Sequence, residues 1–194
     1  MLDQQQQGGV AAVKRRRKWP WIVGGIALAG MAGCIGLFTL VFSGTKAVVD
    51  TVVDNDAGKN AVAGVLGKPA TDGKFQFVVT GMTCGAGHVG DATFGQPAQG
   101  QFCLVDVRVK NVGTSAEIFN DSSQKGYDVK GVEYSVDSGA AVYANKDQST
   151  FLEQINPGNT VKGKLVFDVP RSTKLTQVVL HESAFTAGVR VPLR

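Results

Sequence analysis

The chain has 194 residues, 19% of them charged, and a formal net charge of +4. The excess charge is confined to the first 43 residues, where residues 14–18 are all Lys or Arg and Asp3 is the only acid. The remainder carries as many acidic as basic residues, so its overall charge argues against nucleic-acid binding. The length fits one ordinary domain with additional segments.

The N-terminal 43 residues predict a tail and a membrane span. Residues 1–18 are rich in Gln and Gly, which is typical of a disordered, basic cytoplasmic tail. Residues 19–43 are a predicted transmembrane helix, because residues 21–42 hold no charge and would extend about 33 Å as a helix, enough for a hydrocarbon core of ~30 Å. Since positive residues stay in the cytoplasm, we expect the N-terminus inside and the C-terminal domain outside the cell membrane.

Two other interpretations of this apolar segment are open. A cleaved secretory signal usually has a shorter apolar stretch, of ~7–15 residues. A lipoprotein would be acylated at Cys34, but residues 35–42, which would then begin the mature chain, are apolar instead of a polar tether.

Small residues recur every four positions within the predicted span, at Gly25, Ala29 and Gly33. This spacing lets two helices approach closely in lipid and would support a homodimer. The competing explanation is that Gly and Ala are common in such spans.

Residues 44–71 are predicted to form a stalk or linker. Apolar residues recur at helical spacing over 48–53 and again over 61–66, with Gly58 between them. Two short helices are therefore expected, although valine-rich segments also suit strands.

From residue 72 to the C-terminus, apolar and polar residues alternate. The clearest strands are predicted over 75–80, 103–110 and 161–169, and weaker ones over 127–129, 132–136, 140–143, 150–154, 176–181 and 189–193. Turn residues at 130–131 and 156–159 separate some of these strands. Many short strands without intervening helices predict an all-β fold, an antiparallel β-sandwich, for residues 72–194.

Two of the three cysteines, Cys84 and Cys103, fall in this domain. Cys84 follows one predicted strand and Cys103 begins the next, so a hairpin-like return would bring them together. In an oxidising outer compartment a disulfide is the expected state, and closing a loop of about 20 residues would stabilise the fold by about 3 kcal/mol. A reactive thiol pair is the alternative, but no CxxC spacing supports it.

Several stretches of the domain resemble a known family. They are residues 72–77 (DGKFQF), 100–107 (GQFCLVDV), 109–113 (VKNVG), 121–124 (DSSQ), 155–158 (INPG) and 165–170 (LVFDVP). Their order and spacing resemble an actinobacterial family of membrane-anchored domains of unknown function, some of them labelled telomeric-repeat-binding-factor-like. The resemblance covers about residues 67–194. It implies an immunoglobulin-like sandwich, similar in fold to a secreted mycobacterial immunoprotective antigen, and no established activity.

No catalytic, metal or cofactor site is predicted, because the two histidines, His88 and His181, stand far apart in the sequence without an obvious partner set. The segment between the two cysteines is the candidate binding loop. It contains His88, Asp91 and Phe94, and the disulfide would hold its two ends together. Loops on rigid β-sandwiches commonly bind ligands. A purely structural connection is the competing interpretation.

The sequence therefore predicts a non-enzymatic module, anchored in the lipid bilayer, that binds an extracytoplasmic protein or cell-envelope ligand. An accessory subunit of a membrane complex, associating through the span, is the alternative. An envelope enzyme or metal-binding protein, motivated only by His88 and His181, comes third.

Overall fold

The structure, a computed structural model, describes residues 46–91, 93–145, 151 and 153–194. The chain divides into two compact units, Met1–Ala47 and Val48–Arg194, and nearly all the described residues belong to the second. The predicted tail, the predicted span at 19–43 and the face of Gly25, Ala29 and Gly33 lie outside the described residues. Within the described ranges, no helix has the length and apolarity needed to cross a membrane.

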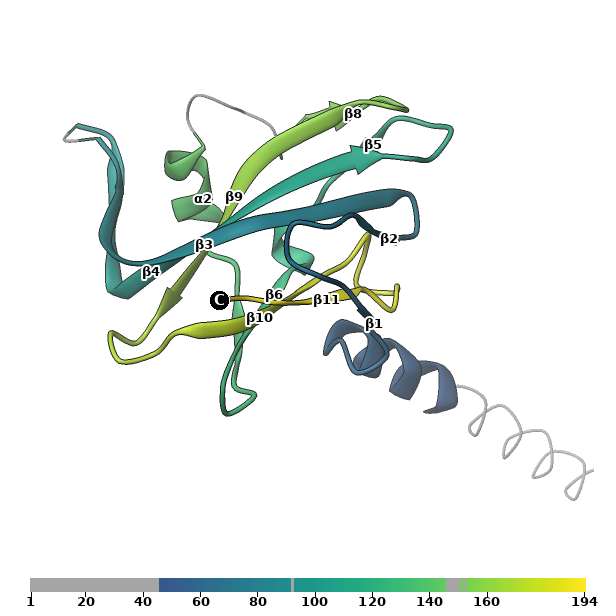
Figure 1. Cartoon of the computed structure of the whole chain (residues 1–194), viewed down its shortest axis with the longest axis horizontal. Helices are drawn as coiled ribbons and strands as arrows, with labels where there is room; N and C mark the ends of the chain where they lie inside the picture. The colour runs from purple at the N-terminus through teal and green to yellow at the C-terminus, as the bar shows by residue number, and fades with distance from the viewer. Residues whose placement is uncertain (1–45, 92, 146–150, 152) are drawn as a thin grey trace, which may run out of the picture. The chain divides into compact units, whose positions relative to one another are not determined.

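Two packed sheets of mainly antiparallel strands form the second unit, which confirms the predicted β-sandwich (Figure 1). The five-stranded sheet has the order β1-β11-β10-β6-β7 and the four-stranded sheet the order β2-β3-β4-β9, while β5 and β8 pair separately. The strands are β1 (Val62–Ala63), β2 (Ala70–Asp72), β3 (Phe75–Gly90), β4 (Gly95–Asn111), β5 (Glu117–Ile118), β6 (Lys125–Asp128), β7 (Glu133–Ser135), β8 (Gln154–Ile155), β9 (Thr160–Val169), β10 (Leu175–Leu180) and β11 (Val189–Pro192). The short helices are η1 (Asp121–Ser123) and α2 (Ser138–Ala144).

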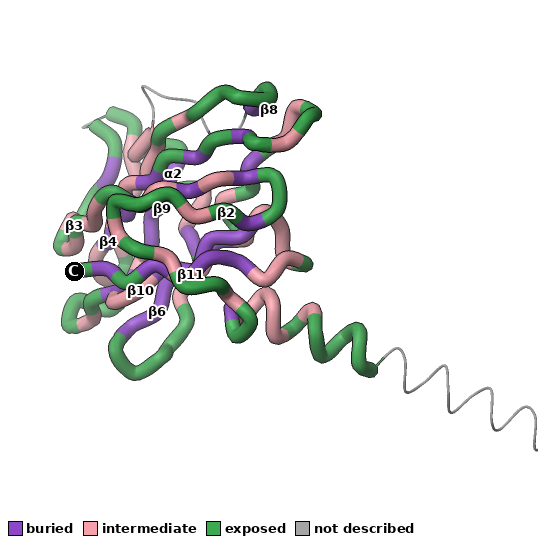
Figure 2. Tube along the Cα trace, turned by 45° about the vertical axis from the view of Figure 1, so that its right-hand side comes forward, coloured by how far each residue is buried: buried purple, intermediate pink, exposed green. Residues whose placement is uncertain are grey.

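The main core lies between the two sheets. On β3 and β4 alternate residues point inward, so that Phe77 pairs with Val109 and Val79 with Val107, all of them buried. Phe119 closes one part of this core, with its ring centroid 5.8 Å from that of Phe75 and 5.0 Å from that of Phe151. Figure 2 shows the buried stretches gathered where the sheets face each other.

Residues 140–143 are part of helix α2, so the strand predicted there is wrong. Asp137 caps the helix, because its side chain accepts a hydrogen bond from the backbone N–H of Ala140 at 2.9 Å. Ala140 and Ala141 are buried in a second, smaller apolar cluster with Phe102 and Val166, on the outer side of the four-stranded sheet. Four residues are too few to distinguish a helical from a strand periodicity.

The segment predicted as a stalk is helical over residues 48–56, as expected, but residues 61–66 do not form the second helix. Instead, β1 pairs in parallel with β11, and β2 pairs with the start of β3. Both strands therefore belong to the sandwich, which begins before residue 72.

The end of the 48–56 helix is fixed to the outer side of the five-stranded sheet. The phenol oxygen of Tyr127 lies 2.8 Å from the carbonyl oxygen of Ala57. Arg190 donates a hydrogen bond to the carbonyl of Gly58 at 2.7 Å. Gly58 has a φ of 64°, and a Cβ there would lie 2.8 Å from Cγ1 of Val179, so only glycine permits this close approach.

The position of Phe119 at the centre of the aromatic cluster predicts a large stability effect. Phe119→Ala should lower the free energy of unfolding by about 3–5 kcal/mol, because it leaves a cavity among packed rings. The matched control is Ile118→Ala at the preceding residue, which is 56% exposed and should cost about 0.5 kcal/mol or less. Urea denaturation of both variants measures the difference, and similar losses would contradict the assignment of Phe119 to the core.

Candidate functional site

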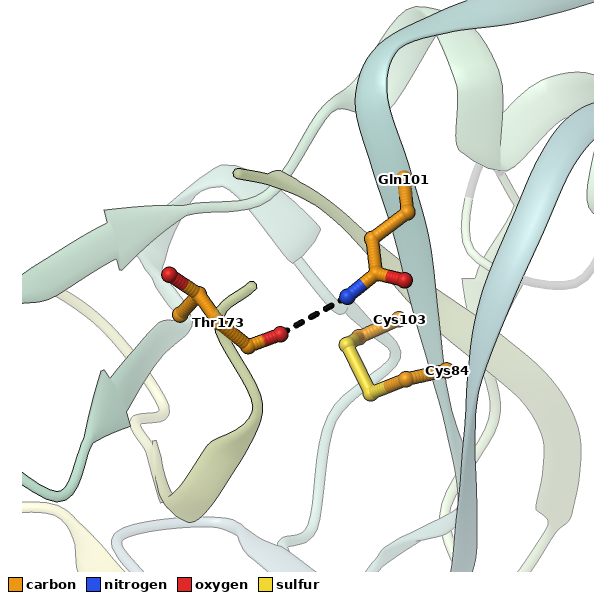
Figure 3. Close-up of a disulfide and its surroundings, with 4 residues drawn as sticks. All are labelled: Cys84, Gln101, Cys103 and Thr173. Carbon is orange, nitrogen blue, oxygen red and sulfur yellow. Dashed lines mark hydrogen bonds between the residues drawn. A yellow bond between two sulfur atoms is a disulfide. The ribbon is translucent and has the colours of Figure 1, made fainter. Parts of the chain in front are cut away.

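Cys84 and Cys103 form a disulfide, as predicted, between directly opposite residues of β3 and β4 (Figure 3). Their Cα atoms are 4.0 Å apart. Cys103 is fully buried in the main core, and Cys84 packs against it. Near the disulfide, the side chain of Gln101 donates a hydrogen bond to the carbonyl of Thr173 at 2.8 Å, which ties β4 to the β9–β10 turn.

The segment between the cysteines is not the loop that the sequence predicted, because the β3–β4 hairpin continues through most of it. His88 pairs with Pro97, and Gly90 with Gly95, so the strands reach almost to the tip. The glycines allow this close pairing: a Cβ on Gly95 would overlap the ring of His88.

The three candidate residues of this segment have different surroundings. His88 is exposed and lies across the hairpin from Pro97. Asp91 shapes the turn, since its Oδ1 accepts hydrogen bonds from the backbone N–H groups of Thr93 and Phe94 at 2.9 and 2.8 Å. Phe94 is 70% exposed. The tip thus presents one aromatic side chain, and a binding role for it stays a prediction.

His181 is completely buried at the end of β10. Its Nδ1 lies 3.1 Å from the carbonyl oxygen of Thr186, and its Nε2 has no hydrogen-bond partner among the described residues. Burial lowers the pKa of His181, and this effect outweighs the hydrogen bond to Thr186 and the charge of Asp72, both of which favour the protonated ring. The ring is thus a neutral core group.

Asp72 organises the turn that follows His181. Its carboxylate accepts hydrogen bonds from the backbone N–H groups of Glu182 and Gly188 and from the hydroxyl of Thr186. Asp72 directly precedes the β2–β3 turn, whereas His88 lies near the far end of the 16-residue β3. The fold therefore does not bring the two histidines together. Across the described parts of the chain, no group of three or more His, Cys, Asp or Glu side chains could hold a metal ion.

On the outer side of the four-stranded sheet, the side chains change from apolar to charged along β4 and β9. At one end, the outward residues Phe102, Leu104 and Val166 are apolar and pack under α2. In the middle, Lys164 forms an ion pair with Asp106, its cross-strand neighbour.

Beyond this ion pair, α2 no longer covers the sheet, and the outward residues of β4 and β9 are basic except for Thr160. Arg108 lies directly opposite Lys162, and Lys110 follows Arg108 two residues along β4. We call the surface of Arg108, Lys110, Lys162 and Lys164 the cationic face. Within the described residues, neither Arg108 nor Lys110 has a carboxylate partner.

Two hollows open on the cationic face, one on each side of Arg108. The larger, of about 520 Å³, is lined by Thr80, Asp106, Asn145, Lys162 and Lys164, among others. The smaller, of about 300 Å³, is lined by Pro69, Gln76, Val78, Lys110 and Thr160, among others. Because Arg108 lines both, its guanidinium group can reach a ligand in either hollow.

Sequence reasoning missed the cationic face. The alternation along residues 103–110 and 161–169 placed these basic residues away from the core, but each strand by itself looked like an ordinary solvated surface. Only the pairing of β4 with β9 brings the two basic rows together.

Two packed sheets, a disulfide-linked β3–β4 hairpin and an outer surface partly covered by α2 define the described part of the chain as a β-sandwich domain. The profile of the family described as "Domain of unknown function (DUF4352)" matches residues 65–190. The chain belongs to this family. No curated protein matches the chain significantly.

Solved structures with a similar fold come from several bacteria. The secreted protein MPT63 of Mycobacterium tuberculosis is 19% identical, with a TM-score of 0.49, over 62% of this chain and 89% of its own. The yjhA protein of Bacillus subtilis is 16% identical, with a TM-score of 0.48, over 66% of this chain and 98% of its own. A conserved hypothetical protein of Bacillus anthracis is 14% identical, with a TM-score of 0.47, over 65% and 93%.

The disulfide predicts a measurable stability loss on its removal. The double variant Cys84→Ala/Cys103→Ala should unfold with a free energy about 3 kcal/mol lower, because the unfolded chain loses a cross-link that closes a loop of this size. Urea denaturation measures the loss. Adding a reductant should bring the wild-type chain to a similar value and leave the double variant unchanged; a wild-type chain insensitive to reductant would contradict the prediction.

The neutral, buried His181 predicts a pH dependence of stability. Its pKa is lowered in the folded state, so below the ordinary value of about 6.5 the unfolded chain binds a proton that the folded chain does not. The free energy of unfolding should fall by up to about 1.4 kcal/mol per pH unit below pH 6.5, until the folded-state pKa is reached.

His181→Gln should remove this component of the pH dependence, while His88→Gln, at the exposed histidine, should retain it. Urea denaturation between pH 7.5 and pH 5 measures both. Identical pH profiles for the two variants would show that His181 is not the responsible group.

Proposed function

We propose that this chain is a non-enzymatic binding module, anchored in the cell membrane by residues 19–43, whose sandwich binds an extracytoplasmic ligand on the cationic face. The uncharged segment at 21–42 and the basic run before it support the anchor and its orientation. The Cys84–Cys103 disulfide fits an oxidising outer compartment. An immunoglobulin-like strand arrangement and the membrane-anchored, actinobacterial branch of the family are part of the same proposal.

The proposed binding role rests on one observation. The outer side of the four-stranded sheet is apolar where α2 covers it, and it is basic where none of the described residues covers it. Arg108 and Lys110 are exposed on this basic part and have no carboxylate partner among the described residues. The face is built on β4 and β9, two long strands in the interior and at the edge of one sheet. Side chains on such rigid elements are positioned more accurately than side chains on loops.

Photocrosslinking in intact cells tests this proposal. A photoreactive amino acid replaces Thr160, which is exposed on the rim of the smaller hollow. The control position is Ser135, which is exposed on β7 at the edge of the other sheet. We expect a discrete crosslinked product from position 160 that position 135 does not give. The same products from both positions, or none from position 160, would rule out the face as the binding surface.

Protease added to whole cells tests the topology separately. Because the sandwich is proposed to lie outside the membrane, the protease should remove epitopes placed after residue 44 and leave an epitope at the N-terminus. Protection of the C-terminal epitope in intact cells, with digestion only after lysis, would contradict the proposed orientation.

The second candidate function is that of an accessory subunit of a membrane complex. The helix over 48–56 favours it, since Val48, Val49 and Val53 are 64%, 58% and 57% exposed, and such apolar surface suits a protein partner close to the membrane. The variant Val49→Asp/Val53→Asp separates the candidates. An accessory subunit should lose its co-purifying partner, whereas the binding module should keep its crosslink at position 160.

A further inference from the structure

Most outer edges of the two main sheets are short or covered. The edge strands β1, β2 and β7 have only two or three residues each. Along β9, the side chain of Asn145 donates to the carbonyl of Lys164 at 2.9 Å and accepts from its N–H at 2.7 Å. The N–H of Asp137 donates to the carbonyl of Val166 at 2.8 Å. These contacts occupy edge groups that could otherwise pair with another strand.

The outer half of β3, residues 81–90, is the exception. β2 pairs with β3 only at residues 75–77, and the N–H of Gly67 donates to the carbonyl of Val79 just beyond them. After Val79, no strand among the described residues lies along this side of β3, and the β3–β4 hairpin extends well past β2 (Figure 1). Residues 81–90 contain no Asp, Glu, Lys, Arg or Pro, although charged residues and proline commonly protect an exposed edge.

Two glycines of this segment have no role within the described structure. Gly81 and Gly87 lie at register shifts of β3, but neither has the positive φ that a glycine bulge uses. A Cβ on either residue would meet no atom within 4 Å. Glycine in a strand costs stability, because its backbone loses more conformational freedom on folding than that of other residues. Such a glycine often marks a place where another backbone approaches closely.

Backbone groups of Met82 and Cys84 point to this open edge. The Cα atoms of Cys84 and Cys103 are 4.0 Å apart, the close spacing of a non-hydrogen-bonded pair on antiparallel strands. The N–H and C=O of Cys84 therefore face away from β4. Met82 pairs with Val105 in the same unbroken register, two residues earlier, so its backbone groups face the same way. Thr83 lies between them, and its side chain is exposed.

We infer that residues 81–84 pair antiparallel with the same residues of a second copy of this chain, across a two-fold axis at Thr83. In this arrangement Met82 of each copy lies opposite Cys84 of the other, so their free N–H and C=O groups satisfy one another. The two Thr83 side chains lie directly opposite each other. The edge thus receives a partner that offers the same row of groups.

The charges of the chain permit this contact between copies. Residues from 44 onward carry as many acidic as basic residues, and residues 81–84 carry none, so two sandwiches do not repel each other at this edge. The inference goes beyond the proposed function and uses only its membrane anchor. Because the anchor confines the copies to one membrane and raises their effective concentration, a short edge pairing is sufficient.

Photocrosslinking between two differently tagged full-length copies in intact cells tests the inference. One copy carries a photoreactive amino acid at position 81, where the fold leaves room for a side chain. We expect a crosslinked product that carries both tags. Thr83→Lys in both copies should lower the crosslinked fraction about fivefold, because like charges directly opposite each other destabilise an antiparallel pair. Thr83→Glu in both copies should have the same effect.

Combining Thr83→Lys in one copy with Thr83→Glu in the other should restore the crosslink, because the opposite charges then face each other. The control variant Ser135→Lys adds the same charge to an exposed position on β7. In both copies it should change the crosslinked fraction by less than about twofold. Thermal melting checks that each variant folds, which is expected for substitutions at exposed positions.

Three outcomes would overturn the inference. The first is a crosslinked fraction that the Thr83 variants leave unchanged, and the second is a failure of the Lys and Glu copies to restore it. The third is a product of position 81 that contains only another protein, which would assign the edge to a different partner. If no product carries both tags while the crosslink at position 160 persists, the second copy is refuted and the proposed function stands.

Discussion

The fold depends above all on the register between β3 and β4. In this pairing one side of the hairpin supplies Phe77, Val79, Val107 and Val109 to the core, and the other side supplies Arg108 to the cationic face. Because side chains alternate with a period of two, a slip of one residue would exchange the two sides. The Cys84–Cys103 disulfide joins directly opposite residues and so excludes such a slip in the oxidised chain. The register between β3 and β4 therefore determines both which side chains enter the core and which side chains lie on the cationic face.

Irregularities in β3 decide where each end of the hairpin points. The pairing with β4 shifts between Val79 and Gly81, between Cys84 and Ala86, and between Ala86 and His88. After the first shift Cys84 packs on the main core, and after the second Ala86 packs with α2 on the opposite side of the sheet. Such bulges bend a strand and re-aim its side chains. This is how a segment that reads as a Gly-rich loop becomes an extension of the sheet that helps to hold α2.

The motifs that carry the family resemblance hold turns and strands in place. Asn111 is buried and donates hydrogen bonds to the carbonyls of Ser115 and Ile155, which fixes β4 to β8. Gln124 is also buried, and it exchanges hydrogen bonds with the backbone of His181. These polar groups are satisfied inside the domain, so they have no capacity left for a ligand. The resemblance therefore identifies the fold, whereas the binding proposal rests on Arg108, outside these motifs, and on Lys110, which lies within residues 109–113.

The sequence by itself determined the features that depend on near neighbours. The alternation over 75–80, 103–110 and 161–169, the turn at Lys130-Gly131 and the pairing of two cysteines across one hairpin are all encoded within short segments. Only the tertiary structure decided features that depend on long-range contacts. Residues 140–143 belong to a helix that packs on an apolar surface. Arg108 lies opposite Lys162 because β4 pairs with β9, a strand distant in the sequence. The local alternation of residues determines on which side of a strand a side chain lies. Its neighbours on the adjacent strand depend on how the strands pair, and a binding surface is formed by such neighbours together.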